Sequence, residues 1–563
     1  MSSTRPARPR KRLPPDVAED KGERIGIFIC RCGGTVSRIV DVDSVAAHAS
    51  SLDSVAFVGV MDFPCSTRGQ AEIREAIKEN GLGRFVVAGC SPKTHERTFR
   101  RVAAGAGLNR FMFEIANIRE QCAFVHAQPE ATEKAKVLVE AATSKCRLLF
   151  PAPYEQVPVS SKRVLVVGGG LSAMIAASHV SDQGFGVVLV DPKGTLDEVS
   201  VTTTHRGVPA EYVRKIVKGL KSSPSTRMLF GAEVVDFQGH PGDFRALIET
   251  PEGEEDVRCG AAILALDAVP FASRAKSEDE RVITQGEFKK LLSSQTTGLG
   301  KVVMIFPKDS SEGTCGRSCH LGAITNALRL KELLPSADVT IICNEVRTYG
   351  MYELDYRKAQ ECGIRFVRCE GEAVIQHEGG LRVLVTDAYS DTTLSLPADL
   401  IVLSDLLKPQ DTRRLAKIFR IPVDMNGFLA VSQVRLEPAS TLREGVFLCG
   451  SATGPRLVSE ELLEASAAAS GAVSLLSSSF IEIGGSVAEV DPEKCSVCLS
   501  CIRSCPYTAP FINENGKAEI DIQTCQGCGI CVGICPSKAI QMYGYTDAQM
   551  EAQSSASIRG GGR

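Results

Sequence analysis

Residues 163–191 read RVLVVGGGLSAMIAASHVSDQGFGVVLVD, a pattern that predicts the fold of the middle of the chain. A strand-forming run meets three glycines, a helix-forming stretch follows, and a second apolar run ends at Asp191. This order predicts a strand–turn–helix–strand unit whose glycines let a pyrophosphate approach the helix start. Asp191 stands where such folds place a ribose-binding acid, roughly 20 residues on. The alternative is a glycine turn that only packs strand against helix. The predicted dinucleotide contacts are Gly168, Gly170, Leu171, Ser172, Ala173 and Asp191.

A second α/β unit is expected further along the chain. It would contain a strand at 301–306, a helix near 318–334, the strand DVTIIC at 338–343 and a helix near 353–362. The chain then reaches GVFLCGSATGPRLVSEELLEASAAASGAVSLL at 445–476. This piece resembles the closing segment of flavoproteins with two dinucleotide domains, in which a helix start approaches the flavin. Its predicted flavin contacts are Gly450, Ser451 and Gly454, and the alternative is an alanine-rich packing helix.

The second unit lacks the glycine fingerprint that flavin reductases of the thioredoxin-reductase type use for NAD(P)H. Residues 307–334 read PKDSSEGTCGRSCHLGAITNALRLKELL instead, which disfavours direct use of a nicotinamide. Cys315 and Cys319 are four residues apart, so we expect them to share a helix face, with His320 adjacent. Thiolates are stabilised at a helix start. The spacing leaves open a metal cluster, a dithiol and two packed cysteines.

The C-terminal region contains two cysteine runs of the form C-x2-C-x2-C-x3-C-P. This repeated spacing is typical of two-cluster ferredoxins, in which the last cysteine of each run binds the other cluster. It disfavours disulfides and zinc. We predict two [4Fe–4S] clusters. The ligands of one are Cys495, Cys498, Cys501 and Cys535, and those of the other are Cys525, Cys528, Cys531 and Cys505.

Length and composition bound the remaining possibilities. The chain has 563 residues, 44% of them apolar, which predicts several domains. A net charge of -3 argues against a nucleic-acid partner as the main function. No apolar run is long enough to span a bilayer, and the N-terminus has no signal-peptide core. With 21 cysteines and no export signal, cofactor binding in a reducing cytoplasm is expected.

The whole chain, from about residue 24 to 550, resembles the A-type subunit of heterodisulfide reductase, a flavin and iron–sulfur protein. The resemblance is carried by GIFICRCGG, PCSTRGQ, VVAGCSPKTHERTF and ANIREQCAFVH near the N-terminus, and by VFLCGSATGP, SAAAS and YGYTDAQM later. It implies a further [4Fe–4S] cluster in the N-terminal domain. The favoured ligands are Cys65, Cys90 and Cys122 with either Cys30 or Cys32; the alternative is that these thiols only pack.

Three departures from the family pattern stand out. The ferredoxin domain that larger members insert after the first unit is missing, so this is a shortened form. In the mid-chain cluster motif, Pro307 and His320 stand where the family has cysteines, so a histidine-bound cluster of higher potential, a zinc site and an empty site are all open. The usual glycine pair after the second strand is replaced by DPKGTLDE at 191–198.

The predicted fold class is α/β. It combines an N-terminal cysteine-containing α/β domain, a thioredoxin-reductase-like flavoprotein core with two dinucleotide domains, and a C-terminal α+β ferredoxin domain. The expected bounds are a disordered tail at 1–23, the N-terminal domain at 24–148, the FAD-binding domain at 160–294 and 401–482, the inserted domain at 295–400, the ferredoxin domain at 486–546 and a tail at 547–563.

The resemblance implies an electron-transfer subunit of a cytoplasmic, multi-subunit anaerobic oxidoreductase. FAD and the clusters would exchange electrons with partner subunits, and no catalytic residues for a substrate stand out. The implied partners are heterodisulfide reductase B- and C-like subunits, hydrogenase-, formate dehydrogenase- or quinone-linked modules, ferredoxin, and a second copy of the chain in a homodimer. The missing domain removes one electron exit, which argues against bifurcation. The alternatives are a self-contained NAD(P)H-dependent flavin reductase and a non-catalytic ferredoxin scaffold.

Overall fold

The structure is a computed structural model that describes residues 24–192, 210–271, 279–294, 299–306, 315–377, 379–404, 406–409 and 411–560. Its chain divides into two compact units. Unit 1 joins Met1–Val157 to Glu482–Arg563, and unit 2 is Pro158–Ile481. The predicted disordered tail at 1–23 lies outside the described residues.

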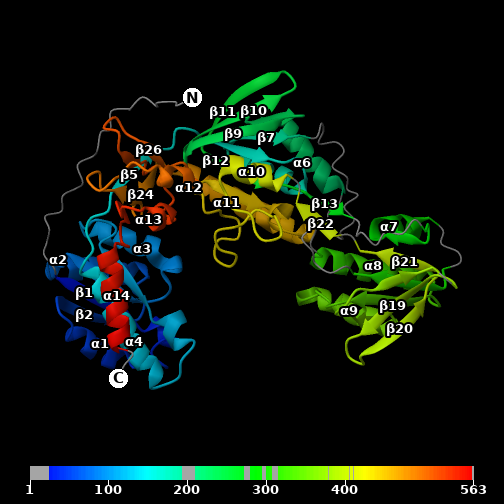
Figure 1. Cartoon of the computed structure of the whole chain (residues 1–563), viewed down its shortest axis with the longest axis horizontal. Coiled ribbons are helices and arrows are strands. Elements are labelled where there is room, and N and C mark those ends of the chain that lie inside the picture. The colour runs from blue at the N-terminus through cyan, green and yellow to red at the C-terminus, as the bar shows by residue number, and fades with distance from the viewer. Residues whose placement is uncertain are drawn as a thin grey trace. The chain divides into compact units, whose positions relative to one another are not determined.

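The first part of unit 1 is a four-stranded parallel sheet in the order β2-β1-β3-β4 (Figure 1). Alternate residues of β1 point to opposite faces. Ile27 and Ile29 pack in one core with α1 and α4, whereas Phe28 packs in a second core with α2 and α3. The strands are β1 (Ile25–Cys30), β2 (Val55–Met61), β3 (Arg84–Gly89) and β4 (Phe113–Asn117). The helices are α1 (Val42–Ser50), α2 (Thr67–Glu79), α3 (Pro92–Gly105) and α4 (Glu130–Cys146), with short turns η1 (Cys32–Gly34) and η2 (Arg119–Ala123).

The second part of unit 1 contains the cysteine runs. Two antiparallel strand pairs, β25 with β28 and β26 with β27, flank the short helices α12 and α13, which pack together. Their bounds are β25 (Ala488–Val490), α12 (Ser500–Ser504), β26 (Pro510–Ile512), β27 (Ala518–Ile520), α13 (Ile530–Ile534) and β28 (Ile540–Met542). The chain leaves unit 1 through β5 (Tyr154–Pro158) and returns through β24 (Phe480–Gly484), which pair with each other.

Residues 547–560 are not the tail that the sequence suggested. They form helix α14 (Asp547–Gly560), which packs along α4 (Figure 1). Gln549 is 1% exposed, and its side-chain N–H donates to the carbonyl of Leu148 at 2.9 Å. Ala556 is also buried. The helix forms because tertiary packing against α4 compensates for a sequence with little apolar periodicity.

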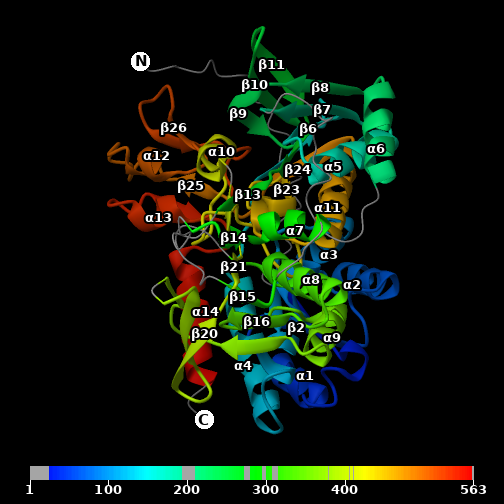
Figure 2. The same ribbon diagram turned by 90° about the vertical axis from the view of Figure 1, so that its right-hand side faces the viewer.

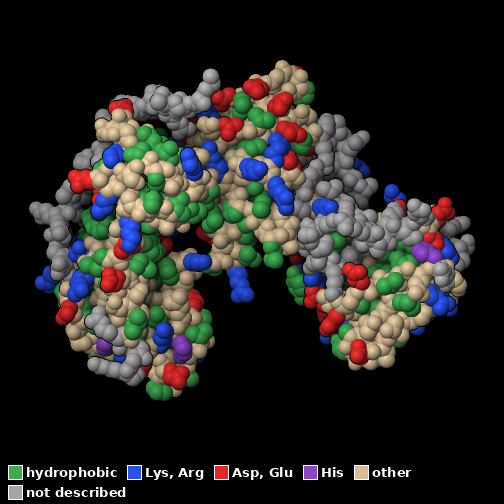
Figure 3. Space-filling model, viewed as in Figure 1, with side chains coloured by type: hydrophobic (Ala, Val, Ile, Leu, Met, Phe, Trp, Pro, Cys, Tyr) green, Lys and Arg blue, Asp and Glu red, His purple; other side chains and the backbone are tan. Residues whose placement is uncertain are grey.

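Unit 2 begins with three layers around a five-stranded parallel sheet in the order β23-β12-β6-β7-β8. One face packs against α5, α6 and α11, and the other against the antiparallel sheet of β9, β10 and β11. Acidic side chains gather over β10 and β11 (Figure 3). The parallel strands are β6 (Arg163–Val167), β7 (Gly186–Asp191), β8 (Thr226–Phe230), β12 (Ala261–Ala265) and β23 (Val446–Cys449). The other elements are α5 (Leu171–Asp182), α6 (Ala210–Ser222), β9 (Glu233–His240), β10 (Asp243–Thr250), β11 (Gly253–Cys259), α10 (Thr412–Phe419), η4 (Gly450–Thr453) and α11 (Val458–Ser477).

The same three-layer plan recurs in the rest of unit 2. A parallel sheet in the order β14-β21-β15-β16-β17 packs against α7, α8 and α9 on one face and the antiparallel sheet β18-β19-β20 on the other (Figure 2). The parallel strands are β14 (Val282–Thr284), β15 (Lys301–Ile305), β16 (Asp338–Cys343), β17 (Arg365–Arg368) and β21 (Leu400–Leu403). The other elements are α7 (Gln285–Ser293), α8 (Arg317–Leu333), η3 (Gly350–Tyr352), α9 (Glu353–Glu361), β18 (Val374–Gln376), β19 (Arg382–Asp387) and β20 (Thr392–Pro397). Strands β13 (Ala268–Phe271) and β22 (Leu406–Pro409) pair between the two layered parts.

These elements confirm the predicted fold class and the predicted second α/β unit. The bounds of that unit differ from the expected 295–400. Because β14 pairs with β21, residues 282–293 belong with it, and the unit extends to Leu403. None of the helices in the described part of the chain has the length and apolar content that a bilayer span needs.

Candidate functional site

One cavity of unit 1 is lined by the first three cysteines of the first run and by the last cysteine of the second run. Cys495, Cys498, Cys501 and Cys535 all line it, with apolar neighbours that include Val490, Ile512 and Ile540. Cys495 and Cys498 lie on the loop that enters α12, where Leu499 has a left-handed backbone with φ of 63°, and Cys501 lies in the first turn of that helix. Cys535 directly follows α13. The structure thus gathers the four thiols that the spacing assigns to one cluster.

The other four cysteines of this region are neighbours, and the charges of some affect the pKa values of others. Burial raises the pKa of Cys531 to about 12, and the charges of Cys525, Cys505 and Cys528 contribute to this rise. Burial also raises the pKa of Cys525, again with Cys505 and Cys528 as neighbours. Cys505, the last cysteine of the first run, therefore lies beside the second set. Burial thus favours the protonated form of Cys525 and Cys531, and a metal centre would replace these protons, since thiolates are the ligands of iron–sulfur clusters.

Three cysteines meet at the carboxyl edge of the N-terminal sheet. Cys30 ends β1 and Cys90 directly follows β3, the adjacent parallel strand. The backbone N–H of Cys32 donates to the Cys30 Sγ at 3.2 Å, and the Arg119 guanidinium donates to the Cys32 Sγ at 3.5 Å. Burial raises the pKa of Cys90 to about 12; the charge of Cys32 adds to this effect and that of Arg119 opposes it. Cys30, Cys32 and Cys90 therefore form one thiol group.

The other two predicted ligands of the N-terminal domain are Cys65 and Cys122. Cys122 is fully buried, and its thiol donates to the carbonyl of Ala131 at 2.7 Å. Cys65 packs against the core that contains Ile73. Within the described residues, no hydrogen bond or electrostatic interaction joins either cysteine to the trio. Of the favoured set, the trio therefore contains Cys90, together with both Cys30 and Cys32.

The first glycine loop of unit 2 lies between β6 and α5, as the sequence predicts. Gly168 has φ of 127°, and a Cβ on it would stand 2.1 Å from the carbonyl oxygen of Ala265. A Cβ on Gly169 would stand 1.9 Å from the Asp191 carboxylate, which is almost fully buried at the end of β7. Helix α5 starts from Gly170 without a capping side chain. Its first N–H groups therefore suit a phosphate.

The closing segment meets this loop. Gly450 has φ of 64°, and a Cβ on it would stand 2.3 Å from the Ser172 Oγ. Ser451 is buried in η4, and Gly454, with φ of 137°, precedes α11. Leu171 and the fully buried Ala173 face the core under the loop. The two predicted groups of flavin contacts, far apart in sequence, thus come together at the carboxyl edge of one sheet.

Carboxylates that the sequence did not single out surround this junction. The Ser451 hydroxyl donates to Glu461 Oε1 at 3.1 Å. The Asp267 Oδ1 lies 2.2 Å from the position that a Cβ on Gly170 would occupy. Burial raises the pKa of Glu461 to about 7, against the hydrogen bond from Ser451. Burial also raises the pKa of Glu464, against its ion pair with Arg456. The spacing of Glu461 and Glu464 on one face of α11 is the only sequence indication of this cluster.

The mid-chain residues lie around the start of α8. Cys315 precedes the helix, because Gly316 is its N-cap, so the expectation that Cys315 and Cys319 share a helix face is wrong. His320 is 4% exposed and stacks on Phe306 with ring centroids 4.3 Å apart. Its Nδ1 accepts the backbone N–H of Arg347 at 3.1 Å, which places the proton of the neutral ring on Nε2. In that state neither nitrogen is available to a metal. Pro307 lies outside the described residues.

Across the described residues, no three Cys, His, Asp or Glu side chains converge closely enough to bind a single metal ion. A [4Fe–4S] cluster has a different requirement, since its four thiolates each bind a separate iron atom. The cavity lined by Cys495, Cys498, Cys501 and Cys535 offers the four thiols that one such cluster needs.

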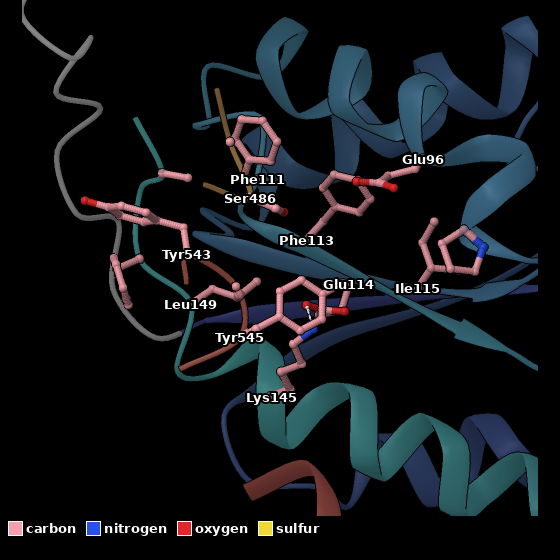
Figure 4. Close-up of a pocket in the computed structure, with 15 residues that line it drawn as sticks. Glu96, Phe111, Phe113, Glu114, Ile115, Lys145, Leu149, Ser486, Tyr543 and Tyr545 are labelled. Atoms are coloured by element: carbon pink, nitrogen blue, oxygen red, sulfur yellow. Dashed lines mark ion pairs between the residues drawn. The ribbon is translucent and has the colours of Figure 1, made fainter. Parts of the chain in front are cut away.

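A separate pocket of unit 1 was not predicted from the sequence (Figure 4). Aromatic side chains of Phe111, Phe113, Tyr543 and Tyr545 line it. Lys145 and Glu114 point toward each other at one end, 2.7 Å apart, with the Lys145 ammonium 4.2 Å from the Tyr545 ring centroid (Figure 4). Burial raises the pKa of Glu114, and Lys145 lowers it. The partners lie far apart in sequence, so only the fold reveals the pair.

A known family and several solved structures resemble parts of this chain. The family model described as "4Fe-4S dicluster domain" matches residues 488–536, which confirms the predicted ferredoxin domain. Solved structures that resemble the chain include the thioredoxin reductases of T. acidophilum and Lactococcus lactis. The first is 17% identical to this chain and the second 14%, and both have a TM-score of 0.39. Each alignment covers 56% of this chain, together with 100% of the first reductase and 99% of the second.

Curated relatives resemble nearly the whole chain. It is 30% identical to an iron–sulfur A-type subunit of the CoB–CoM heterodisulfide reductase of Methanopyrus kandleri over 611 residues, covering 88% of this chain and 91% of the relative. It is 29% identical to the A-type subunit of the "H(2):CoB-CoM heterodisulfide,ferredoxin reductase" of Methanothermobacter thermautotrophicus, covering 88% and 93%. The first alignment spans 611 positions, more than the 563 residues of this chain, so the relative has residues there that this chain lacks. On this similarity, the chain belongs to the family of A-type subunits of heterodisulfide reductase, which are oxidoreductases.

Proposed function

We propose that this chain is the FAD- and iron–sulfur-containing electron-transfer subunit of a multi-subunit anaerobic oxidoreductase. One observation carries the proposal. The last cysteine of each C-terminal run lies with the first three of the other run, which is the ligand exchange of two-cluster ferredoxins. Such an exchange would tie two one-electron centres into one small fold. The relatives are named as reductase subunits, which supports a redox role.

The junction of the two glycine segments suits FAD. The N–H groups at the start of α5 would hold its pyrophosphate, and the Asp191 carboxylate would accept a hydrogen bond from its ribose. Gly450, Ser451 and Gly454 would border it from the closing segment. When bound, FAD supplies the exchange between two-electron and one-electron chemistry. Asp267 is an unusual neighbour for a phosphate, but the donors at the helix start fit the cofactor.

A third cluster in the N-terminal domain belongs to the proposal. Its best-supported thiols are Cys30, Cys32 and Cys90, and Cys65 or Cys122 would complete a set of four. The mid-chain position with Cys315, Cys319 and His320 is the weakest candidate, because the imidazole is already used within the protein. Both positions would exchange electrons with partners.

The substrate site would lie on another polypeptide of the complex. We assign partners of the heterodisulfide reductase B and C type, with hydrogenase-, formate dehydrogenase- or quinone-linked modules as further candidates, and a homodimer within a cytoplasmic complex. Ferredoxin is a further candidate, because the names of several relatives include it. Among them are the protein of Methanothermobacter thermautotrophicus described above and the A-type subunit of the "Ferredoxin:CoB-CoM heterodisulfide reductase" of Methanosarcina acetivorans.

The test is iron and FAD content of protein purified without oxygen. The ferredoxin domain alone requires about 8 iron atoms per chain, and further clusters raise the count toward roughly 16. One FAD with about 12 iron atoms is the expected result. Full cluster loading without FAD would support the scaffold alternative. Fast bleaching of the flavin by NADH alone would support the NAD(P)H-dependent alternative.

A further inference from the structure

The carboxyl edge of the N-terminal sheet exposes large apolar side chains around the thiol trio of Cys30, Cys32 and Cys90. Phe63 follows β2 and is 51% exposed, and Phe124 and Val125 follow β4 and are 58% and 63% exposed. The Phe63 ring covers the tight turn after Cys32, because it lies 2.7 Å from an ideal Cβ on Gly33. All these residues belong to loops at one edge, since the four strands are parallel.

Positive side chains surround this apolar centre. Arg31 and Arg38 flank the turn after β1, and Arg119 lies 5.7 Å from the centroid of the Phe124 ring. Lys93 and Arg97 are exposed one turn apart on α3, which begins two residues after Cys90. Within the described residues, neither Lys93 nor Arg97 forms an ion pair. Their charges therefore remain available to a partner.

The acidic side chains of the same edge are fewer and mostly paired inside the domain. Asp43 pairs with Arg31 at 3.4 Å. Glu120 pairs with Arg119 and also accepts the backbone N–H of Ser91 at 3.0 Å. Asp62 follows β2 and is exposed. The face therefore carries a positive balance although the whole chain carries -3.

We infer that this edge is the docking face for an acidic, ferredoxin-type electron carrier. An apolar centre within a polar rim is the usual anatomy of a protein interface. The cations of the rim would steer a negative partner and fix its orientation. Docking would place the carrier's cluster next to the thiol trio. In one encounter the reduced carrier loses one electron, and the centre bound by the trio gains it. The electron step rests on the proposed function, but the docking itself does not.

A membrane or a nucleic acid fits this face less well. The cations come from separate loops and one helix, with exposed aromatic rings between them, so they do not form the continuous basic helix that lies on anionic lipid. They also surround redox-capable thiols, which only a redox partner would use.

The test is binding of an oxidised, acidic plant-type [2Fe–2S] ferredoxin to the full holoprotein, measured by calorimetry at low salt. The charge-reversal variant is Lys93→Glu with Arg97→Glu. Its matched control is Arg214→Glu with Lys218→Glu, an exposed pair of the same spacing on α6 of unit 2. Iron content and thermal unfolding of both variants are compared with the parent protein, so that misfolding is detected.

We expect the parent and control proteins to bind alike and the Lys93/Arg97 variant to bind at least about 10-fold more weakly, since two favourable charge pairs become repulsive. Raising the salt should weaken binding of the parent toward that of the variant. No binding to the parent, or equal binding by all three proteins, overturns the inference. Preference for anionic phosphatidylserine vesicles or duplex DNA over the ferredoxin also overturns it. Because both proteins are oxidised, failure here is independent of the iron and FAD content that tests the proposed function.

Discussion

Glu461 is the carboxyl at the predicted flavin junction whose charge should respond to pH near neutrality. Its pKa is about 7 in the folded chain against an ordinary 4.5, mainly because it is buried, with Asp267, Glu464 and Arg456 as charged neighbours. Between pH 4.5 and pH 7 this carboxyl loses its proton in the unfolded chain and keeps it in the folded chain. The contribution of Glu461 to the free energy of unfolding is therefore greatest below about pH 4.5, and it falls by up to about 3 kcal/mol as pH rises through 7.

The variant Glu461→Gln should remove this loss, because an amide keeps the hydrogen bond from Ser451 and does not ionise. Urea unfolding of unit 2 between pH 5 and pH 8 should show a smaller decline for the variant than for the parent. Glu211→Gln, at an exposed position of α6, is the control and should keep the parent slope. An unchanged slope in Glu461→Gln would mean that another group sets the pH dependence.

Gly450 is the residue at which the two glycine segments touch. Its left-handed φ of 64° and the 2.3 Å separation between an ideal Cβ and the Ser172 Oγ leave no room for a side chain. Gly450→Ala should weaken FAD binding by at least about 10-fold, since a strained backbone costs about 1–3 kcal/mol. Fluorescence titration of the apoprotein with FAD measures this. Gly322→Ala is the control, because nothing lies within 4 Å of a Cβ there, in the interior of α8. That change should leave FAD binding intact and stabilise the helix by about 0.5–1 kcal/mol. Equal FAD affinities of the two variants would mean that Gly450 is not part of the FAD site.

At the scale of elements, strand β4 is joined to the end of α4 by the buried pair of Glu114 and Lys145. Lys145 is 4% exposed, so removing it leaves a carboxylate without its counter-charge. Lys145→Met should destabilise unit 1 by about 3–5 kcal/mol at pH 8. The loss should shrink toward pH 5, because burial raises the pKa of Glu114 and the acid takes up a proton more readily there. The double change Lys145→Met with Glu114→Leu should recover most of the stability. Urea unfolding measures all three proteins, and a loss below about 1 kcal/mol in the single variant would show that the pair is not energetically important.

Elements with a local pattern could be predicted from the sequence, and those that depend on distant partners could not. The glycine loop before α5 and the cysteine loops before α12 and α13 follow from residues that are neighbours in the chain. Helix α14 has little periodicity of its own and forms through its packing on α4. The inward position of Cys122 likewise depends on α4, whose Ala131 carbonyl accepts its thiol. A motif identifies which cysteines exist, but the loops decide which of them meet.

At the level of the whole molecule, the apolar core of the ferredoxin region in unit 1 is much smaller than the cores of unit 2. Unit 2 contains large apolar cores made of strands and helices. The ferredoxin region has a small core in which Cys501 and Cys531 stand among a few residues such as Ile520 and Ile540. Its stability must come largely from metal, as in other small metal-bound domains.

Removal of iron from the holoprotein with a chelator should therefore unfold residues 488–542 and leave unit 2 folded. The ligand exchange makes this loss cooperative, because each cluster would link both cysteine runs and the loss of one frees thiols in both. Hydrogen exchange followed by mass spectrometry should show fast exchange in β25–β28 and unchanged protection in β6, β7 and β12 of unit 2. Cys505→Ser should produce part of the same change, and its iron loss should fall on the cluster of Cys525, Cys528 and Cys531. The control Cys362→Ser removes an exposed thiol of α9's C-terminal end and should lose no iron. Protection of the ferredoxin region that survives complete iron removal would mean that its apolar core suffices, and that the clusters serve electron transfer without holding the fold.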